Sequence, residues 1–260
     1  MLGAGNGYHD WGGTMGTMDG MVTVVTGASV GIGRAIAEAF AREGAAVAMV
    51  ARTTSDIERA ALEVDEATGG RTLALTCDVS SEADVQRLVA TVEGELGAID
   101  VFVNNAGVPG PRAFMQQVEL ADFEQVLRIN VLGTFLCAKA VAPQMVERRR
   151  GRIINMSGAG GGSSAVRGGA PYNTSKGAIE SFTRTAGLEL AARDVLCVAI
   201  MPGRVETRGF PFFDKTPPQE REYAVPPDYA ARLAVWLATE ATLDVAGQTI
   251  NAVEWAKSRE

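Results

Sequence analysis

The sequence predicts a doubly wound α/β domain built around a seven-stranded parallel sheet. Short runs rich in β-branched residues alternate with longer segments of helical periodicity from Met21 onward. A glycine-rich turn joins the first run to the first helical segment. The chain has 260 residues, 47% hydrophobic and 21% charged, which suits one globular domain.

The seven apolar runs have the length and composition of strands that are buried on both faces of a sheet. Strands are expected at residues 22–26, 46–51, 73–76, 99–103, 152–156, 195–201 and 247–253.

Helical periodicity fills the intervals between the strands. Gly44 ends the first helix, and Ser80 or Ser81 caps the third, with acidic residues in its first turn. Pro143 lies inside the longest helix and should kink it. Helices are expected at residues 31–43, 57–67, 81–96, 120–148, 171–192 and 227–239.

Two segments fall outside this pattern. Residues 1–20 hold seven glycines and three methionines, which predicts a flexible extension before a single domain at 21–260. Residues 203–225 show little periodicity, and we expect them to form a lid over the substrate. The sequence 210–213, Phe-Pro-Phe-Phe, favours an apolar or aromatic-walled pocket, although it could equally anchor the lid.

The net charge of −7 argues against affinity for nucleic acid or for an anionic membrane surface. No uninterrupted apolar run of about 18 residues is present, so no membrane-spanning segment is expected. Residues 148–150 are three successive arginines at the end of a predicted helix. A solvated helix terminus explains them best, and a phosphate or partner site is the alternative.

The cysteine and histidine content limits the chemistry further. Cys77, Cys137 and Cys197 are odd in number and scattered, which predicts buried, reduced thiols and a cytoplasmic protein. His9 is the only histidine, so neither a histidine-based metal site nor a Ser-His-Asp triad can be assembled, and no metal is expected.

Tyr172 and Lys176 are four residues apart in a predicted helix and therefore share one face. A fixed cation beside a phenol favours the phenolate and lowers the tyrosine pKa from about 10. This spacing predicts a tyrosine that both donates and accepts a proton.

Gly27, Gly31 and Gly33 lie between the first strand and the first helix, with Ser29 and Ile32 in the same turn. Such a turn lets the backbone approach a pyrophosphate, which then sits at the helix N-terminus. The strand–turn–helix context predicts a dinucleotide site, although the GxxxGxG spacing differs from the commoner GxGxxG.

The end of the second strand distinguishes the two nicotinamide coenzymes. An NAD site usually offers a carboxylate there, whereas this chain has Arg52 and Thr53, with no acid before Asp56. A cation with neighbouring hydroxyls suits a 2′-phosphate, so NADP is favoured. Val30 occupies the usual place of a second basic residue in the glycine turn, which leaves NAD as the alternative.

Two further strand ends suit a nucleotide. Asp78 and Val79 follow the third strand, where a carboxylate can accept a hydrogen bond from the adenine amine. Residues 104–107, Asn-Asn-Ala-Gly, follow the fourth strand, and small residues such as Ala106 and Gly107 let the backbone pass close to a ribose. Plain turn chemistry is the alternative at both places.

With these features together, the chain resembles the short-chain dehydrogenase/reductase family in its compact single-domain form. The resemblance runs from residue 22 to about residue 253. It rests on the glycine turn, Asp78-Val79, Asn104-Asn-Ala-Gly107, Asn130, Tyr172-xxx-Lys176 and Pro202-Gly203-x-Val205-x-Thr207.

The resemblance implies roles for the catalytic residues. Tyr172 would protonate the carbonyl oxygen in reduction, and Lys176 would bind the nicotinamide ribose and lower the tyrosine pKa. Asn130 would hold a water that relays protons to Lys176. Asn104 and Gly107 would line the ribose pocket.

The resemblance also implies the coenzyme contacts, fold and assembly. Val205 and Thr207, which follow Pro202 and Gly203, would meet the nicotinamide carboxamide. The fold would be a Rossmann fold with strand order 3-2-1-4-5-6-7. The assembly would be a homodimer or homotetramer formed through the helices near 120–148 and 171–192.

One departure from the family pattern affects catalysis. Ser157 matches the first of two expected serines, whereas Gly158, or Ala159 by the spacing from the tyrosine, takes the place of the second. Three readings stay open: Ser157 swings in, Ser163 or Ser164 folds back, or backbone N–H groups replace the hydroxyl. Ser157 is narrowly favoured.

A second departure is at the C-terminus, where residues 251–255 replace the usual Asp-Gly-Gly. Trp255 could close the substrate pocket, pack at a subunit interface, or cover the core.

The leading hypothesis is an NAD(P)-dependent oxidoreductase that interconverts a ketone and a secondary alcohol, with a small-molecule carbonyl or alcohol as substrate. Reduction is the favoured direction if the coenzyme is NADP. The first alternative is a catalytically impaired nucleotide-binding regulator of the same fold, which the missing serine suggests. A lyase or epimerase that keeps the phenol is the other.

Overall fold

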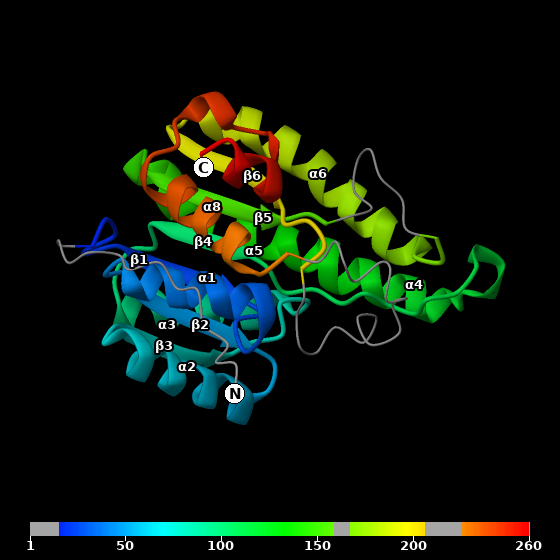
Figure 1. Cartoon of the computed structure of the whole chain (residues 1–260), viewed down its shortest axis with the longest axis horizontal. Coiled ribbons are helices and arrows are strands. Elements are labelled where there is room, and N and C mark those ends of the chain that lie inside the picture. The colour runs from blue at the N-terminus through cyan, green and yellow to red at the C-terminus, as the bar shows by residue number, and fades with distance from the viewer. Residues whose placement is uncertain (1–15, 159–166, 206–224, 260) are drawn as a thin grey trace, which may run out of the picture.

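The computed structural model describes residues 16–158, 167–205 and 225–259, and its seven strands form one parallel sheet (Figure 1). The strand order is β3-β2-β1-β4-β5-β6-β7, which confirms the predicted fold class and order. The strands are β1 (Val22–Thr26), β2 (Ala46–Ala51), β3 (Arg71–Thr76), β4 (Val101–Asn104), β5 (Gly151–Met156), β6 (Val195–Met201) and β7 (Thr249–Asn251).

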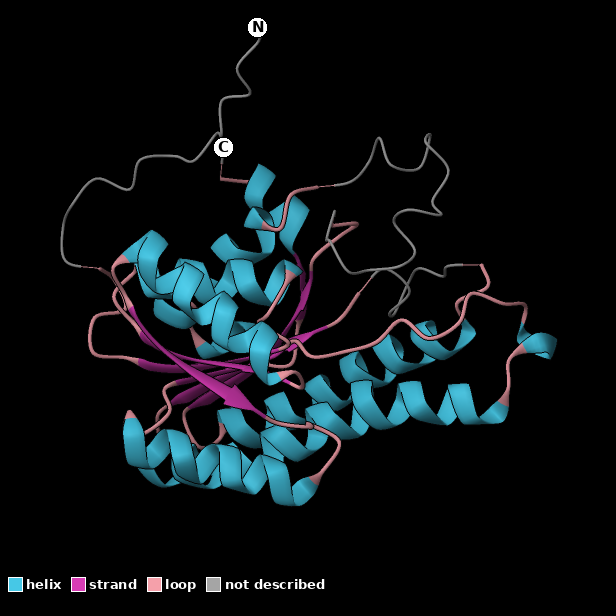
Figure 2. Ribbon diagram, turned by 90° about the horizontal axis from the view of Figure 1, so that it is seen from below, coloured by secondary structure: helices cyan, strands magenta, loops and turns pink. Residues whose placement is uncertain are grey.

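Helices cover both faces of the sheet (Figure 2). One apolar core lies under α1 (Gly31–Arg42), α2 (Thr54–Thr68) and α8 (Asp228–Thr239), with Phe40 fully buried at its centre. The opposite core lies under α3 (Glu82–Glu95), α5 (Gly133–Arg148) and α6 (Ala170–Ala191). This two-sided burial explains why the strands read as apolar runs rather than alternating patterns.

The boundary signals in the sequence have clear structural counterparts at α3. Ser81, rather than Ser80, is the N-cap residue, and its hydroxyl accepts a hydrogen bond from the Asp84 amide. The capping hydroxyl satisfies one of the amides that the first helical turn leaves without a partner.

The longest predicted helix is interrupted, but not at Pro143. A π-helical segment, η2 (Arg128–Leu132), separates α4 (Leu120–Leu127) from α5, whereas Pro143 lies inside regular α5. The kink expected at Pro143 stays a prediction, and the irregular turn carries Asn130. Such π segments inside α-helices are frequent at functional sites.

The sequence was expected to lack an apolar segment long enough to span a membrane, and the same helix contradicts that expectation. Over Leu120–Arg148, 29 residues, one 18-residue window has a mean hydropathy of 1.4, enough for a membrane span by length and composition alone. In the structure, however, this helix is part of the core, because α5 packs on α3, β4 and β5. Burial within the domain accounts for 44% of that window, and Leu120, Leu132 and Phe135 remain exposed.

The N-terminal boundary also differs from expectation. Met18 is fully buried in the core beneath α1, and its amide donates to the Glu43 carbonyl at 2.8 Å. Thr17 Oγ1 donates to Glu43 Oε2 at 2.7 Å. Residues 16–20 therefore belong to the packed domain, which shortens the proposed extension to residues 1–15, outside the described part of the chain.

The C-terminus turns earlier than predicted. The last strand ends at Asn251, whose side chain accepts from the amides of Val253 and Glu254 and so caps α9 (Ala252–Lys257). Trp255 packs against Trp236 of α8 with ring centroids 5.7 Å apart. Of the three roles considered for Trp255, the structure supports covering the core.

Candidate active site

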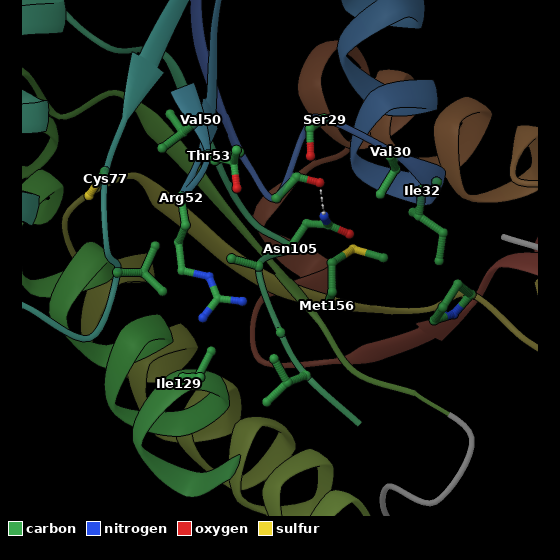
Figure 3. Close-up of a pocket in the computed structure, with 18 of the residues that line it drawn as sticks. Ser29, Val30, Ile32, Val50, Arg52, Thr53, Cys77, Asn105, Ile129 and Met156 are labelled. Atoms are coloured by element: carbon green, nitrogen blue, oxygen red, sulfur yellow. Dashed lines mark hydrogen bonds between the residues drawn. The ribbon is translucent and has the colours of Figure 1, made fainter. Parts of the chain in front are cut away.

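A cavity of about 320 Å³ opens beyond the carboxyl ends of the central strands, where open α/β sheets usually bind ligands. It brings together predicted residues from seven separate places in the sequence, and Figure 3 labels some of those in the glycine turn and at the end of β2. The predicted residues on its wall are Gly27, Ser29, Gly31, Ile32, Arg52, Thr53, Val79, Ala106, Gly107, Ser157, Tyr172, Lys176 and Pro202.

The glycine turn forms the floor of the cavity. Gly27 and Gly31 have φ values of 66° and 63°, the left-handed region that favours glycine. At Gly33, which is buried and off the cavity wall, a side chain would collide with the Asn105 amide nitrogen and the Gly27 carbonyl. Asn105 Nδ2 donates to Thr26 O at 2.9 Å and to Gly27 O at 3.2 Å. Asn105 therefore fixes the shape of the turn.

The start of α1 suits an anion. Its N-cap residue is Val30, whose side chain makes no capping hydrogen bond, and the first turn carries no acidic residue. Unlike the Ser81 cap of α3, this terminus leaves backbone N–H groups for a ligand. A dinucleotide pyrophosphate fits these donors.

Arg52 follows β2 and extends across the cavity in Figure 3. Among the residues that the structure describes, it takes part in no ion pair, in contrast to Arg59 on the following helix, which pairs with Asp56. Thr53, the residue before α2, makes no side-chain cap hydrogen bond and also lines the cavity. A 2′-phosphate would match this unpaired cation and hydroxyl.

Two predicted nucleotide contacts lie elsewhere. Asn104 is buried and turned away from the cavity, because its Nδ2 donates to Asn155 Oδ1 at 2.9 Å. Asp78 is exposed and off the cavity wall, and it accepts from the Ser80 amide and hydroxyl at 2.9 and 2.8 Å. Asp78 stabilises the local turn here, which matches the alternative of turn chemistry, whereas Asn104 links the ends of β4 and β5.

Further residues line the cavity without having been predicted. The side chain of Asn105, one position past the predicted Asn104, anchors the glycine turn; alternation along an extended chain could have pointed to it. The others are mostly apolar residues at strand ends, which composition does not distinguish from core. They are Val30, Val50, Ala51, Cys77, Val108, Ile129 and Met156.

The segment after β6 is partly described. Pro202 lines the cavity, whereas Gly203, with φ 80°, and Val205, bridged to Val225, lie outside its wall. Thr207, the aromatic run at 210–213, and Ala159, Ser163 and Ser164 lie outside the described residues.

Tyr172 and Lys176 lie one turn apart on α6, and both line the cavity. Lys176 Nζ donates to Met156 O at 2.7 Å and lies 5.5 Å from the Tyr172 ring centroid. Burial raises the pKa of Tyr172 to about 12 and lowers the pKa of Lys176 to about 8. The expected lowering of the Tyr172 pKa is therefore wrong for this arrangement, because desolvation of the phenol outweighs the attraction of the ammonium.

Asn130 is fully buried in the π-helical turn, and its side chain joins two other segments. Its Nδ2 donates to Val108 O and to Ser175 Oγ, both at 2.9 Å, and its Oδ1 accepts from Val108 N at 2.8 Å. Ser175 Oγ in turn donates to Tyr172 O at 2.7 Å. Asn130 thus connects the loop after β4 to the helix turn that carries the tyrosine.

Ser157 does not point its hydroxyl at the phenol. Ser157 Oγ donates to Glu180 Oε1 at 2.5 Å, and both residues are buried. Gly158 lies directly against Tyr172, so that a Cβ at position 158 would collide with the phenol oxygen. Neither residue offers a side-chain donor to a substrate oxygen in this arrangement.

The chain is similar to known dehydrogenases and reductases. Residues 21–216 match the family model for short chain dehydrogenases. A putative ketoacyl reductase from Streptomyces coelicolor is 41% identical over 197 residues, which cover 74% of each chain.

Two solved structures are similar along nearly the whole chain. A variant of actinorhodin polyketide ketoreductase with NADPH has a TM-score of 0.84 and 32% identity, covering 91% of this chain and 97% of its own. NAD⁺-bound xylitol dehydrogenase has a TM-score of 0.83 and 31% identity, and the match covers 90% of this chain and 98% of its own.

The fold and the cavity define an NAD(P)-dependent oxidoreductase that acts on CH–OH and C=O groups. The chain belongs to the short-chain dehydrogenase/reductase family. The names of these relatives are those of reductases and dehydrogenases, and none of them supports the alternative of an impaired regulator.

Proposed function

We propose that this protein reduces a ketone to a secondary alcohol with NADPH, and that Tyr172 gives the carbonyl oxygen its proton. One observation carries the proposal: the buried pair Tyr172 and Lys176 shares a cavity with a turn suited to a pyrophosphate. When bound there, NADPH supplies the hydride. The chain's own contribution is to hold the ketone beside the phenol and to exclude water.

The preference for NADP rests on Arg52. It extends into the cavity without an ion-pair partner among the described residues, and no carboxylate stands where NAD sites usually have one. The similar actinorhodin ketoreductase was solved with NADPH, which favours the same coenzyme, and xylitol dehydrogenase with NAD⁺.

The relatives suggest where to look for substrates. The putative ketoacyl reductase and the polyketide ketoreductase are named for ketone reduction on acyl chains, so we propose ketoacyl compounds as the first substrates to test.

We also propose a homodimer or homotetramer. Apolar surface is exposed by Leu132 at the end of η2, by Phe135 on α5 and by Leu188 on α6. The three free, buried cysteines suit the proposed cytoplasmic location.

The direct test is NADPH oxidation with a panel of ketoacyl esters, aromatic ketones and sugars, in wild type and Tyr172→Phe. We expect at least one ketone to be turned over by the wild type, and kcat to fall by about 10² or more in the variant, because general acid catalysis contributes that much. Tyr229→Phe on α8 is the matched control and should retain wild-type activity. Equal turnover by wild type and Tyr172→Phe would disprove the mechanism.

A further inference from the structure

Glu180 is a buried acidic residue on the catalytic helix to which the sequence assigned no role. It lies one turn beyond Lys176 on α6, and 6% of its surface is exposed. Carboxylates are seldom buried unless they are paired. Among the described residues Glu180 forms no ion pair, and its hydrogen bond is the 2.5 Å contact from Ser157 Oγ.

Glu180 and Lys176 hold two successive residues at the end of β5. Lys176 Nζ donates to Met156 O at 2.7 Å, and Glu180 accepts from the side chain of Ser157. The Ser157 amide donates to Ile200 O at 2.9 Å. The backbone that leaves β5 is therefore fixed by α6 on one side and by β6 on the other.

This attachment determines where Gly158 lies. With Ser157 held against α6, the next residue lies so close to Tyr172 that a Cβ would overlap the phenol oxygen. The backbone at Gly158 thus forms one wall of the space that the phenol occupies. Any movement of Ser157 would change that wall.

The same hydrogen bond limits what Ser157 can do itself. A serine hydroxyl carries a single proton, and here that proton is donated to Glu180. Ser157 cannot donate to a substrate oxygen at the same time. Swinging in would leave a buried carboxylate without its partner, which is costly.

We propose that Glu180 is a positioning residue: by accepting the hydrogen bond of Ser157, it holds Gly158 against the Tyr172 hydroxyl and keeps the phenol in its catalytic position. The catalytic consequence rests on the proposed ketone reduction. The structural consequence, a fixed backbone at the end of β5, does not.

The test compares Glu180→Leu, Glu180→Gln, Ser157→Ala and the Ser157→Ala/Glu180→Leu double variant. Glutamine keeps an acceptor oxygen, whereas leucine fills similar space without one. Glu189→Gln, an exposed change on the same helix, is the control. Each variant is measured by amide hydrogen exchange of the segment ending at Gly158 and by steady-state kinetics with NADPH.

For hydrogen exchange, we expect Glu180→Leu to speed exchange at residues 157–158 by about tenfold, as the loss of one buried hydrogen bond implies. Glu180→Gln and Glu189→Gln should exchange as the wild type does. Wild-type exchange in Glu180→Leu would overturn the proposal, whether or not a substrate has been found.

For kinetics, we expect Glu180→Leu and Ser157→Ala each to lower kcat by about tenfold with KM for NADPH unchanged, and Glu180→Gln to restore most of it. The double variant should be no slower than either single variant, because both substitutions remove the same hydrogen bond between Ser157 and Glu180. A loss of 10² or more in Ser157→Ala, with wild-type kcat in Glu180→Leu, would instead make Ser157 the direct donor. If the wild type reduces no ketone, the proposed function fails while hydrogen exchange still decides the role of Glu180.

Discussion

The backbone of Gly158 lies against the phenol oxygen of Tyr172, and Gly158 is one of the two positions, with Ala159, where the family pattern could place a serine. The two features exclude each other as the structure stands, because a side chain at 158 would occupy the space of the Tyr172 hydroxyl. In this arrangement a serine at 158 would place its Cβ against the hydroxyl of the catalytic tyrosine.

This relationship predicts that Gly158→Ser fails to improve catalysis. The new Cβ must displace the phenol, so we expect kcat to fall by about tenfold or more rather than rise, since misplaced catalytic groups are costly. Gly158→Ala should behave alike, because the clash arises at Cβ. Gly177→Ala, where the added methyl group meets nothing within 4 Å, is the control. A Gly158→Ser variant faster than the wild type would contradict the geometry.

Arg52→Ala should weaken NADPH binding by about ten- to a hundredfold and leave NADH binding unchanged. A charge-assisted contact to a phosphate is worth roughly 1.5–3 kcal/mol, and only NADPH carries the 2′-phosphate. Titrations of both coenzymes by fluorescence measure the effect. Arg59→Ala removes an exposed, ion-paired arginine from α2 and should change neither affinity. Equal NADPH affinity in Arg52→Ala and the wild type would remove the basis for the coenzyme preference.

Asn130→Ala should lower the free energy of unfolding by about 2–3 kcal/mol, because it removes three hydrogen bonds of a buried side chain and leaves their partners unsatisfied. Urea denaturation measures the loss. Gln125→Ala, an exposed change on α4, should be nearly neutral. A stability within about 0.5 kcal/mol of the wild type would show that Asn130 is not a structural link.

The lowered pKa of Lys176 predicts that the free energy of unfolding increases with pH between about pH 8 and pH 10.5. Its pKa is about 8 in the folded protein against 10.5 ordinarily, so between these values the unfolded chain binds more protons and stability rises with pH. The raised pKa of Tyr172 acts oppositely, but only above about pH 10.

The measurement is urea denaturation of the wild type and Lys176→Met at about pH 7 and about pH 10. The stability of the wild type relative to the variant should rise by about 2.5 kcal/mol across this range. Contributions from the cysteines, whose pKa values burial raises, are shared and cancel in the difference. A difference that stays constant with pH would show that Lys176 titrates normally.

Sequence reasoning reached the fold because the five inner strands are largely buried on both faces, which leaves a clear apolar pattern, whereas the edge strands β3 and β7 are only partly buried. It reached Arg52 and Tyr172 because their chemistry is tied to fixed positions in the topology. It missed Glu180 because a lone glutamate in a helix usually faces solvent, and only the packing of α6 on β5 shows otherwise. It placed Asn104 in the cavity rather than Asn105, since spacing alone does not tell which of two neighbours points inward.

The side chain of Asn105, at the end of β4, donates to the glycine turn, and the Ala28 amide of the same turn donates to Val50 O of β2 at 3.0 Å. Arg52, which we propose selects the coenzyme, follows β2. Asn105, whose side chain shapes the turn that suits the diphosphate, and Arg52, proposed to bind the adenosine end, thus follow different strands. An engineer could exchange residues 52 and 53 to redirect the protein toward the other nicotinamide carrier while the floor stays intact.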